Sequence, residues 1–97
     1  MKREQVVQIL NEHKKEIKER FGVKSLILFG SVAREESTPA SDIDLLVEFS
    51  QPAGYFKLFE LQDYLEWMLG CPVDIGTPNS LKPSIRYRIQ GEMLRVF

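Results

Sequence analysis

Hydrophobic residues in the first fifth of the chain recur at the spacing of an amphipathic helix. Val6, Leu10 and Ile17 stand four and seven positions apart, with mostly polar and charged residues between them. Gly22 follows this stretch, and glycine is typical of the position that ends a helix. The pattern predicts one helix over residues 3–20.

Short, mostly hydrophobic runs farther along the chain are typical of β-strands. Strands are predicted over residues 25–29, 43–49 and 72–75, with a short edge strand over residues 93–97. Helices are expected directly after Gly30, over about fifteen residues before Gly70 and near residues 81–90. This order predicts an α/β (α+β) fold with a small mixed β-sheet and helices packed on it.

Length and composition narrow the class of protein. Ninety-seven residues leave room for one domain, expected over residues 1–97, and 43% hydrophobic with 28% charged residues is a globular composition. No hydrophobic run approaches the ~20 residues of a membrane span. The single cysteine, Cys71, excludes an internal disulfide and fits a cytoplasmic location.

The charges nearly cancel, but they are unevenly distributed. The net charge of −1 argues against direct binding of nucleic acid or of an anionic membrane. Residues 1–20 carry six basic and four acidic side chains, residues 34–66 carry two and eight, and residues 74–97 carry four and two. The acidic middle suits a cation site beside groups that hold an anion, although the charges alone favour three ordinary solvated surfaces.

Three carboxylates are candidate metal ligands. Asp42 and Asp44 are two residues apart at the start of the second strand, so both side chains point to one face of the sheet. Asp74, on the third strand, joins them if the two strands are neighbours. Carboxylate oxygens suit Mg²⁺, and two such ions could clamp the attacking and leaving oxygens of a phosphoryl transfer. Each aspartate on its own is more commonly a turn or cap residue.

Gly30 and Ser31 are candidates for phosphate binding. They lie where the first strand ends and a short helix is expected to begin. Glycine lets a phosphate approach the backbone, and the N–H groups of a helix start and the serine hydroxyl can donate to it. Arg34 lies three residues later, near the same face of that turn. A glycine–serine pair alone is more commonly a plain helix cap.

The combination of these motifs resembles the signature of the minimal nucleotidyltransferase family, relatives of DNA polymerase beta. Ten residues separate Gly30-Ser31 from Asp42-Ile43-Asp44. The resemblance extends over nearly the whole chain and implies the nucleotidyltransferase fold. The resemblance implies that Gly30 and Ser31 contact the triphosphate of the nucleotide. It also implies that Asp42, Asp44 and Asp74 are catalytic and bind Mg²⁺, with two ions expected. Arg34 matches a frequent basic position and is a further nucleotide-binding candidate.

The resemblance also implies an activity and a partner. Stand-alone members of this size are typically antitoxins of HEPN-type ribonuclease toxins, and they resemble enzymes that transfer AMP from ATP to a toxin tyrosine. Our hypothesis is therefore a Mg²⁺-dependent protein adenylyltransferase that acts on a HEPN toxin. The alternatives are an antitoxin that only sequesters its partner and a nucleotidyltransferase that acts on a small molecule. The sequence indicates neither the acceptor, the nucleotide preference nor the homo- or hetero-oligomeric state.

Several conspicuous side chains have no assigned role. Phe59, Tyr64 and Trp67 occupy the helix before Gly70 and are expected in the core or at an interface. Lys82 and Arg86 share a helical face, which is either solvated or in contact with a partner or the triphosphate.

Overall fold

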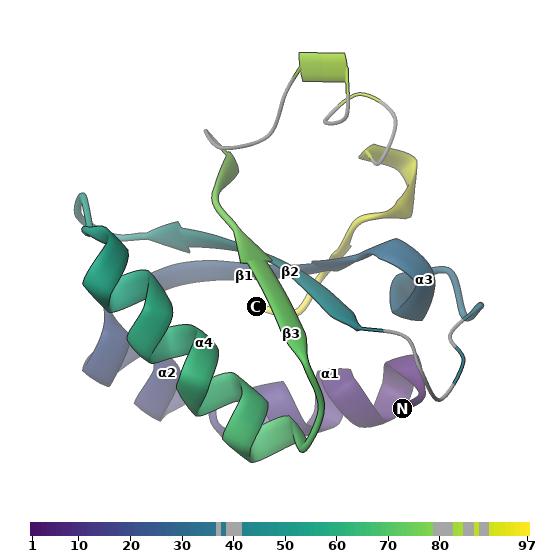
Figure 1. The fold of residues 1–97 in the computed structure, drawn as a ribbon, viewed down its shortest axis with the longest axis horizontal. Helices are drawn as coiled ribbons and strands as arrows, with labels where there is room; N and C mark the ends of the chain where they lie inside the picture. The colour runs from purple at the N-terminus through teal and green to yellow at the C-terminus, as the bar shows by residue number, and fades with distance from the viewer. Residues whose placement is uncertain (37, 39–41, 79–82, 85–86, 88–89) are drawn as a thin grey trace.

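Four strands and their flanking helices form a mixed sheet with helices packed on it, as expected (Figure 1). The computed structural model describes residues 1–36, 38, 42–78, 83–84, 87 and 90–97. The elements are α1 (Arg3–Glu12), α2 (Lys14–Phe21), β1 (Val23–Phe29), α3 (Gly30–Ala33), β2 (Ile43–Phe49), α4 (Tyr55–Leu69), β3 (Val73–Gly76), the 3₁₀ turn η2 (Gln90–Glu92) and β4 (Leu94–Arg95).

The strand order of the sheet is β3-β2-β1-β4. β1 pairs antiparallel with β2 and with β4, whereas β2 and β3 run parallel. α4 provides the crossover between β2 and β3, which a parallel pair requires. The expected edge strand at the end of the chain is confirmed as β4, which pairs with the outer side of β1.

One face of the sheet builds the core against α1, α2 and α4, which lie on the same side of it (Figure 1). Alternate residues of β2, Ile43, Leu45 and Val47, are buried there. Leu61 and Leu65 of α4 are fully buried in the same cluster. Because side chains alternate along a strand, Asp44 and the preceding Asp42 point to the other face.

The single helix expected over residues 3–20 is wrong, because the chain breaks it at His13. His13 has φ −107° and ψ 13°, which ends α1 and begins α2. Its ring Nδ1 lies 2.9 Å from the carbonyl of Ile9, one turn earlier. Leu10 of α1 and Ile17 of α2 are both buried in the core. The hydrophobic spacing therefore predicts the buried residues correctly, although the helix that carries them is interrupted.

The helix expected before Gly70 is confirmed as α4, fifteen residues long, and Gly70 ends it in the left-handed conformation. Its aromatic residues divide into two groups. Tyr64 packs, half-buried, against the core, but Phe59 and Trp67 are 56% and 80% exposed, so the core interpretation fails for these two.

The helix expected near residues 81–90, with Lys82 and Arg86, lies largely outside the described residues. None of the helices in the parts of the chain that the structure does describe is long and apolar enough to cross a lipid bilayer.

Candidate active site

Strand register brings the second and third candidate carboxylates together. Asp44 of β2 and Asp74 of β3 are partners in the parallel ladder, and neighbouring strands lie about 4.8 Å apart. Partners in register project to the same face of a sheet. Asp42 lies two residues before Asp44, just outside β2, and is exposed. The adjacency of strands on which the predicted cluster depended is therefore present.

The three carboxylates interact electrostatically. Burial raises the pKa of the half-buried Asp44 carboxyl, and the negative charges of Asp74 and Asp42 raise it further. The positive charge of Arg34 acts in the opposite direction. Like charges at this spacing disfavour one another's ionised form. A bound cation would relieve that repulsion.

The side chains are not gathered into a ready-made metal cage. Within the described ranges, no three His, Cys, Asp or Glu side chains form a group that could hold one metal ion. The repulsion between the carboxylates opposes their gathering by themselves. That all three carboxylates share an ion therefore stays a prediction.

Gly30 packs directly against the Asp44 carboxylate. It has φ +78°, in the left-handed region that favours glycine. A Cβ added to Gly30 would overlap Oδ2 of Asp44 and would lie 3.0 Å from its Cγ. The preceding residue, Phe29, is the ladder partner of Asp44. Glycine is thus required here for two reasons, the left-handed backbone and the close contact with the Asp44 carboxylate. The sequence had suggested a different reason, which is the close approach of a phosphate.

Ser31 lies in α3, a single helical turn directly after β1. The turn is anchored by Val32 and Ala33, which are buried in the core. Arg3 of α1 holds its far end: Nη1 donates to the Ala33 carbonyl at 3.4 Å, and Nη2 lies 3.0 Å from a Glu35 oxygen. Gly30 and Ser31 are therefore held next to Asp44 by packing on one side and by α1 on the other.

Arg34 is engaged with two carboxylates. Its Nε donates to Glu36 at 3.1 Å, and its Nη1 donates to Glu92 of η2 at 2.9 Å. These two acceptors raise the pKa of the guanidinium, which stays charged. Arg34 is thus placed beside the site, as expected, but a triphosphate would compete with Glu36 and Glu92 for it.

Two contacts of α4 could not be expected from the sequence. Gln62 Nε2 donates to the Val73 carbonyl at 2.9 Å, and Glu66 Oε2 accepts a hydrogen bond from the Val73 N–H at 3.0 Å. Their spacing of four residues places both on one helical face. Nothing in the sequence indicates that this face meets the residue before Asp74.

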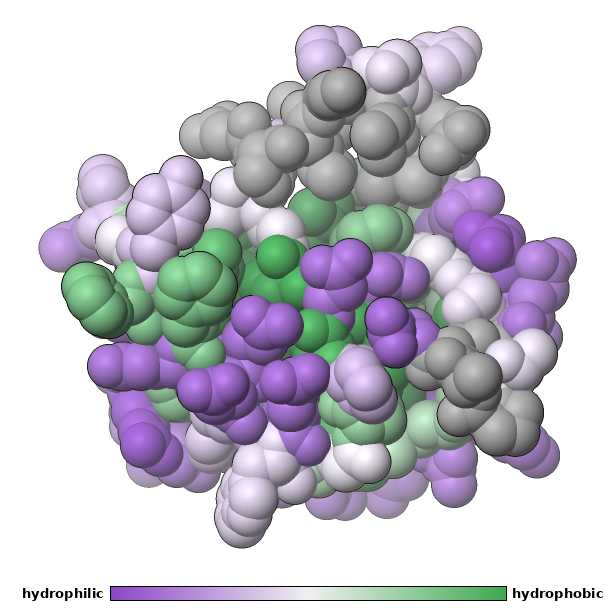
Figure 2. All heavy atoms as spheres, viewed as in Figure 1, coloured by the Kyte–Doolittle hydropathy of each residue, from purple (hydrophilic) through white to green (hydrophobic). Residues whose placement is uncertain are grey.

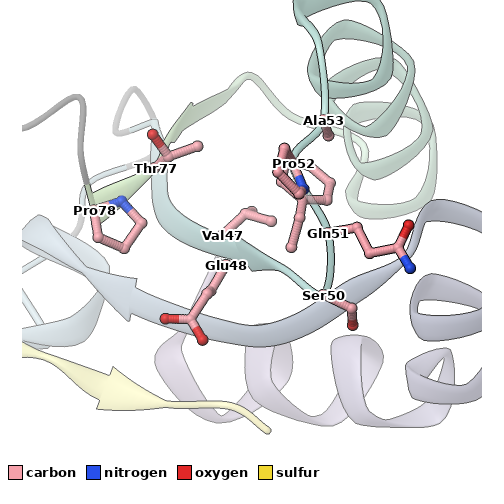
Figure 3. Close-up of a pocket in the computed structure, with 9 residues that line it drawn as sticks. Val47, Glu48, Ser50, Gln51, Pro52, Ala53, Thr77 and Pro78 are labelled. Carbon is pink, nitrogen blue, oxygen red and sulfur yellow. The ribbon is translucent and has the colours of Figure 1, made fainter.

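A cavity of about 460 Å³ opens at the other end of β2 (Figure 3). Its lining runs from Val47 to Ala53 and includes Thr77 and Pro78, which follow β3. Asp44 lies near the start of β2, whereas the cavity is lined by the last three residues of that strand, from Val47 to Phe49, and by residues that follow it. The cavity and the carboxylates are therefore separate features of the molecule.

Comparison with known proteins defines the class of this chain. Residues 10–96 match the model of the nucleotidyltransferase domain. The chain therefore belongs to the nucleotidyltransferase domain family, and it is a nucleotidyltransferase.

Two relatives narrow the comparison. The chain is 45% identical over 93 residues to a "putative protein adenylyltransferase" of Methanocaldococcus jannaschii, covering 95% of both chains. It is 42% identical over 93 residues to the protein adenylyltransferase MntA of Thermococcus cleftensis, covering 96% of this chain and 94% of MntA.

Solved structures agree with this assignment. A "putative minimal nucleotidyltransferase" is 33% identical, with a TM-score of 0.80, and the match covers 97% of this chain and 95% of that one. At the level of the fold alone, the chain also matches one chain of the solved complex of tri-AMPylated Shewanella oneidensis HEPN toxin with MNT antitoxin. That match is 17% identical, with a TM-score of 0.67, and covers 94% of this chain and 71% of the other.

The residues present fit a divalent cation of the Mg²⁺ type. The candidate ligands are all carboxylate oxygens, the donors that Mg²⁺ prefers. Two of them, Asp44 and Asp74, are brought together by strand register. Burial raises the pKa of Asp44 most, and the negative charges of Asp74 and Asp42 raise it further, a repulsion that a cation would offset. Asp42, Asp44 and Asp74 are thus the residues that would hold the ion.

Proposed function

We propose that this chain is a Mg²⁺-dependent protein adenylyltransferase that moves AMP from ATP to a tyrosine hydroxyl of a HEPN-type toxin, and so acts as its antitoxin. The observation that carries the proposal is the register of Asp44 and Asp74 beside the Gly30–Ser31 turn. The names of the relatives support the choice of AMP as the group transferred and of a protein as the acceptor.

Each site residue has a defined task in this reaction. Gly30 and Ser31 contact the triphosphate with backbone N–H groups and a hydroxyl, while Asp42 and Asp44 hold the metal. Bound Mg²⁺ supplies charge neutralisation at the phosphate oxygens. Asp74 completes the set and takes the proton of the acceptor hydroxyl.

The covalent change is a displacement at the α-phosphorus of ATP. The acceptor oxygen forms a bond to this phosphorus, and the bond from the phosphorus to the bridging oxygen of the β-phosphate breaks. Pyrophosphate leaves with that electron pair, and Asp74 takes up the proton released by the acceptor. Arg34 moves from Glu92 to the triphosphate as the nucleotide binds.

Exposed aromatic residues on α4 support a protein partner. Tyr55, Phe56 and Trp67 are 79%, 87% and 80% exposed, and hydrophobic side chains gather over the first turns of this helix in Figure 2. Large aromatic residues exposed together are typical of protein interfaces. The acidic residues between them, Glu60 and Asp63, favour a partner surface that is basic.

The same surface also favours the second candidate function, an antitoxin that covers its partner without modifying it. Both functions need the partner to bind, but only the first needs the carboxylates. The use of ATP and a cytoplasmic location are parts of the proposed adenylyltransferase function, because ATP is its substrate.

The test is to mix the purified chain with ATP, Mg²⁺ and the protein encoded beside it, where a HEPN toxin is expected, and to measure the mass of that protein. Wild type is expected to add AMP, and Asp42→Asn and Asp44→Asn are expected to abolish the addition. Glu48→Gln is the matched control, because Glu48 lies on β2 and is exposed. A tight complex with no added mass would favour sequestration instead.

A further inference from the structure

Two side chains of α4 form hydrogen bonds with the backbone of the edge strand β3 at the residue immediately before Asp74. Glu66 accepts from the Val73 N–H at 3.0 Å, and Gln62 donates to the Val73 carbonyl at 2.9 Å. Both hydrogen bonds are partly buried, which shields them from competition with water. Both backbone groups of Val73 are therefore bound by a helix.

β3 depends on such bonds because it is short and lies at the edge of the sheet. It has four residues and, among the strands that the structure describes, it neighbours only β2. The Ile43 N–H donates to the Pro72 carbonyl at 3.1 Å, so the backbone carbonyl of Pro72 points toward β2. The backbone N–H and carbonyl of the next residue, Val73, therefore point away from β2. Gln62 and Glu66 stand on that outer side, where a further strand would otherwise pair.

The position of Val73 determines the position of Asp74, which follows it. The Val73 side chain is buried, so it ties β3 to the core while its backbone is bound to α4. We propose that Gln62 and Glu66 are positioning residues that hold Asp74 opposite Asp44 and thereby set the affinity of the site for a divalent cation. This inference rests on the metal role of Asp74 in the proposed function.

The bonding pattern defines which substitutions matter. Glu66 contributes an acceptor oxygen, so Glu66→Gln preserves the bond to the Val73 N–H, whereas Glu66→Ala removes it. Gln62 contributes an N–H donor, which Gln62→Leu removes at similar volume. Glu60 is exposed on the same helix, so Glu60→Ala is the matched control for the loss of a glutamate.

The experiment measures binding of Mn²⁺ alone to the purified chain by electron paramagnetic resonance. The Gln62→Leu/Glu66→Ala variant is expected to bind Mn²⁺ about 10-fold more weakly, the scale on which residues that orient metal ligands act. Asp74→Asn is expected to weaken binding to a similar extent. Combining all three changes should add little to Asp74→Asn, while Glu66→Gln and Glu60→Ala should retain wild-type affinity.

Circular dichroism establishes that each variant is folded, and backbone amide exchange at Asp74 gives a second measurement that needs no metal. Faster exchange at Asp74 in Gln62→Leu/Glu66→Ala, with unchanged exchange in β1, supports the inference. Wild-type Mn²⁺ affinity and exchange in that variant, with weakened binding in Asp74→Asn, would overturn it while leaving the proposed function intact. Wild-type affinity in Asp74→Asn would overturn the metal role of Asp74, and the inference with it.

Discussion

Asp74 of β3 stands opposite Asp44 of β2 in a parallel ladder, so two carboxylates share one face of the sheet at a single strand spacing. Such a pair is unfavourable for folding, because burial and the neighbouring negative charges raise the pKa of Asp44. Proteins often retain locally unfavourable arrangements of this kind at functional sites. The stability of the chain is therefore expected to increase when this charge is removed.

Asp44→Asn should raise the melting temperature at pH 7 by roughly 2–5 °C while abolishing transfer. Because its pKa is raised in the folded state, Asp44 favours folding below its ordinary value of 3.8 and loses that contribution as the pH rises through the folded value. The difference from wild type should therefore disappear below about pH 4. Calorimetric melting from pH 3 to pH 8 measures it. Asp63→Asn, which removes an exposed carboxylate of α4, is the matched control.

Gly30→Ala should cost more stability than the same change at the other glycines. The left-handed backbone costs alanine about 1–2 kcal/mol, and the overlap with Asp44 adds about 1–3 kcal/mol. Gly70 has φ +72° but open space around it, so Gly70→Ala should show the backbone cost alone, and Gly54→Ala neither cost. Urea unfolding measures all three variants. Equal losses of unfolding free energy in Gly30→Ala and Gly70→Ala would show that the contact with Asp44 does not add to the cost.

Glu92→Gln should lower the KM for ATP by about two- to fivefold, because it weakens the ion pair that competes with the triphosphate for Arg34. Arg34→Ala should raise the same KM. Steady-state transfer assays at varied ATP concentration measure both effects. Glu48→Gln, which breaks the exposed Lys24–Glu48 pair, should leave the KM unchanged. An unchanged KM in Arg34→Ala would remove Arg34 from the nucleotide-binding set.

The double substitution Phe56→Ser/Trp67→Ser should weaken partner binding by at least about tenfold without lowering the free energy of unfolding, because both side chains are exposed. Isothermal titration calorimetry with the HEPN protein measures the binding. Tyr87→Ser, which removes an exposed aromatic side chain outside α4, is the control. Equal affinity of all three proteins would place the interface elsewhere.

Much of the sheet follows from local sequence. The bounds of β2 and the fifteen-residue length of α4 agree with hydrophobic spacing and with the glycine at position 70. The break at His13 could not be predicted, because the hydrophobic residues on both sides keep one helical spacing and His13 is neither glycine nor proline. Local pattern thus specifies which residues face the core better than it specifies where a helix is interrupted.

The candidate site is only partly encoded in local sequence. The spacing of Asp42 and Asp44 predicts a shared face, but the position of Asp74 beside them depends on the order of the strands, which a crossover through α4 sets. The bonds from Gln62 to Val73 and from Arg34 to Glu92 join residues 11 and 58 positions apart. Contacts of this kind arise from tertiary packing and leave no periodic signal.

The central claim is that the carboxylates beside Gly30 and Ser31 transfer AMP to a partner protein. The most direct measurement compares ATP labelled at the α-phosphate with ATP labelled at the γ-phosphate, incubated with the chain, Mg²⁺ and the HEPN protein. The proposal predicts that the α-label alone appears on the HEPN protein and that Asp44→Asn prevents this. Label from the γ-phosphate, or α-label that persists in Asp44→Asn, would contradict it.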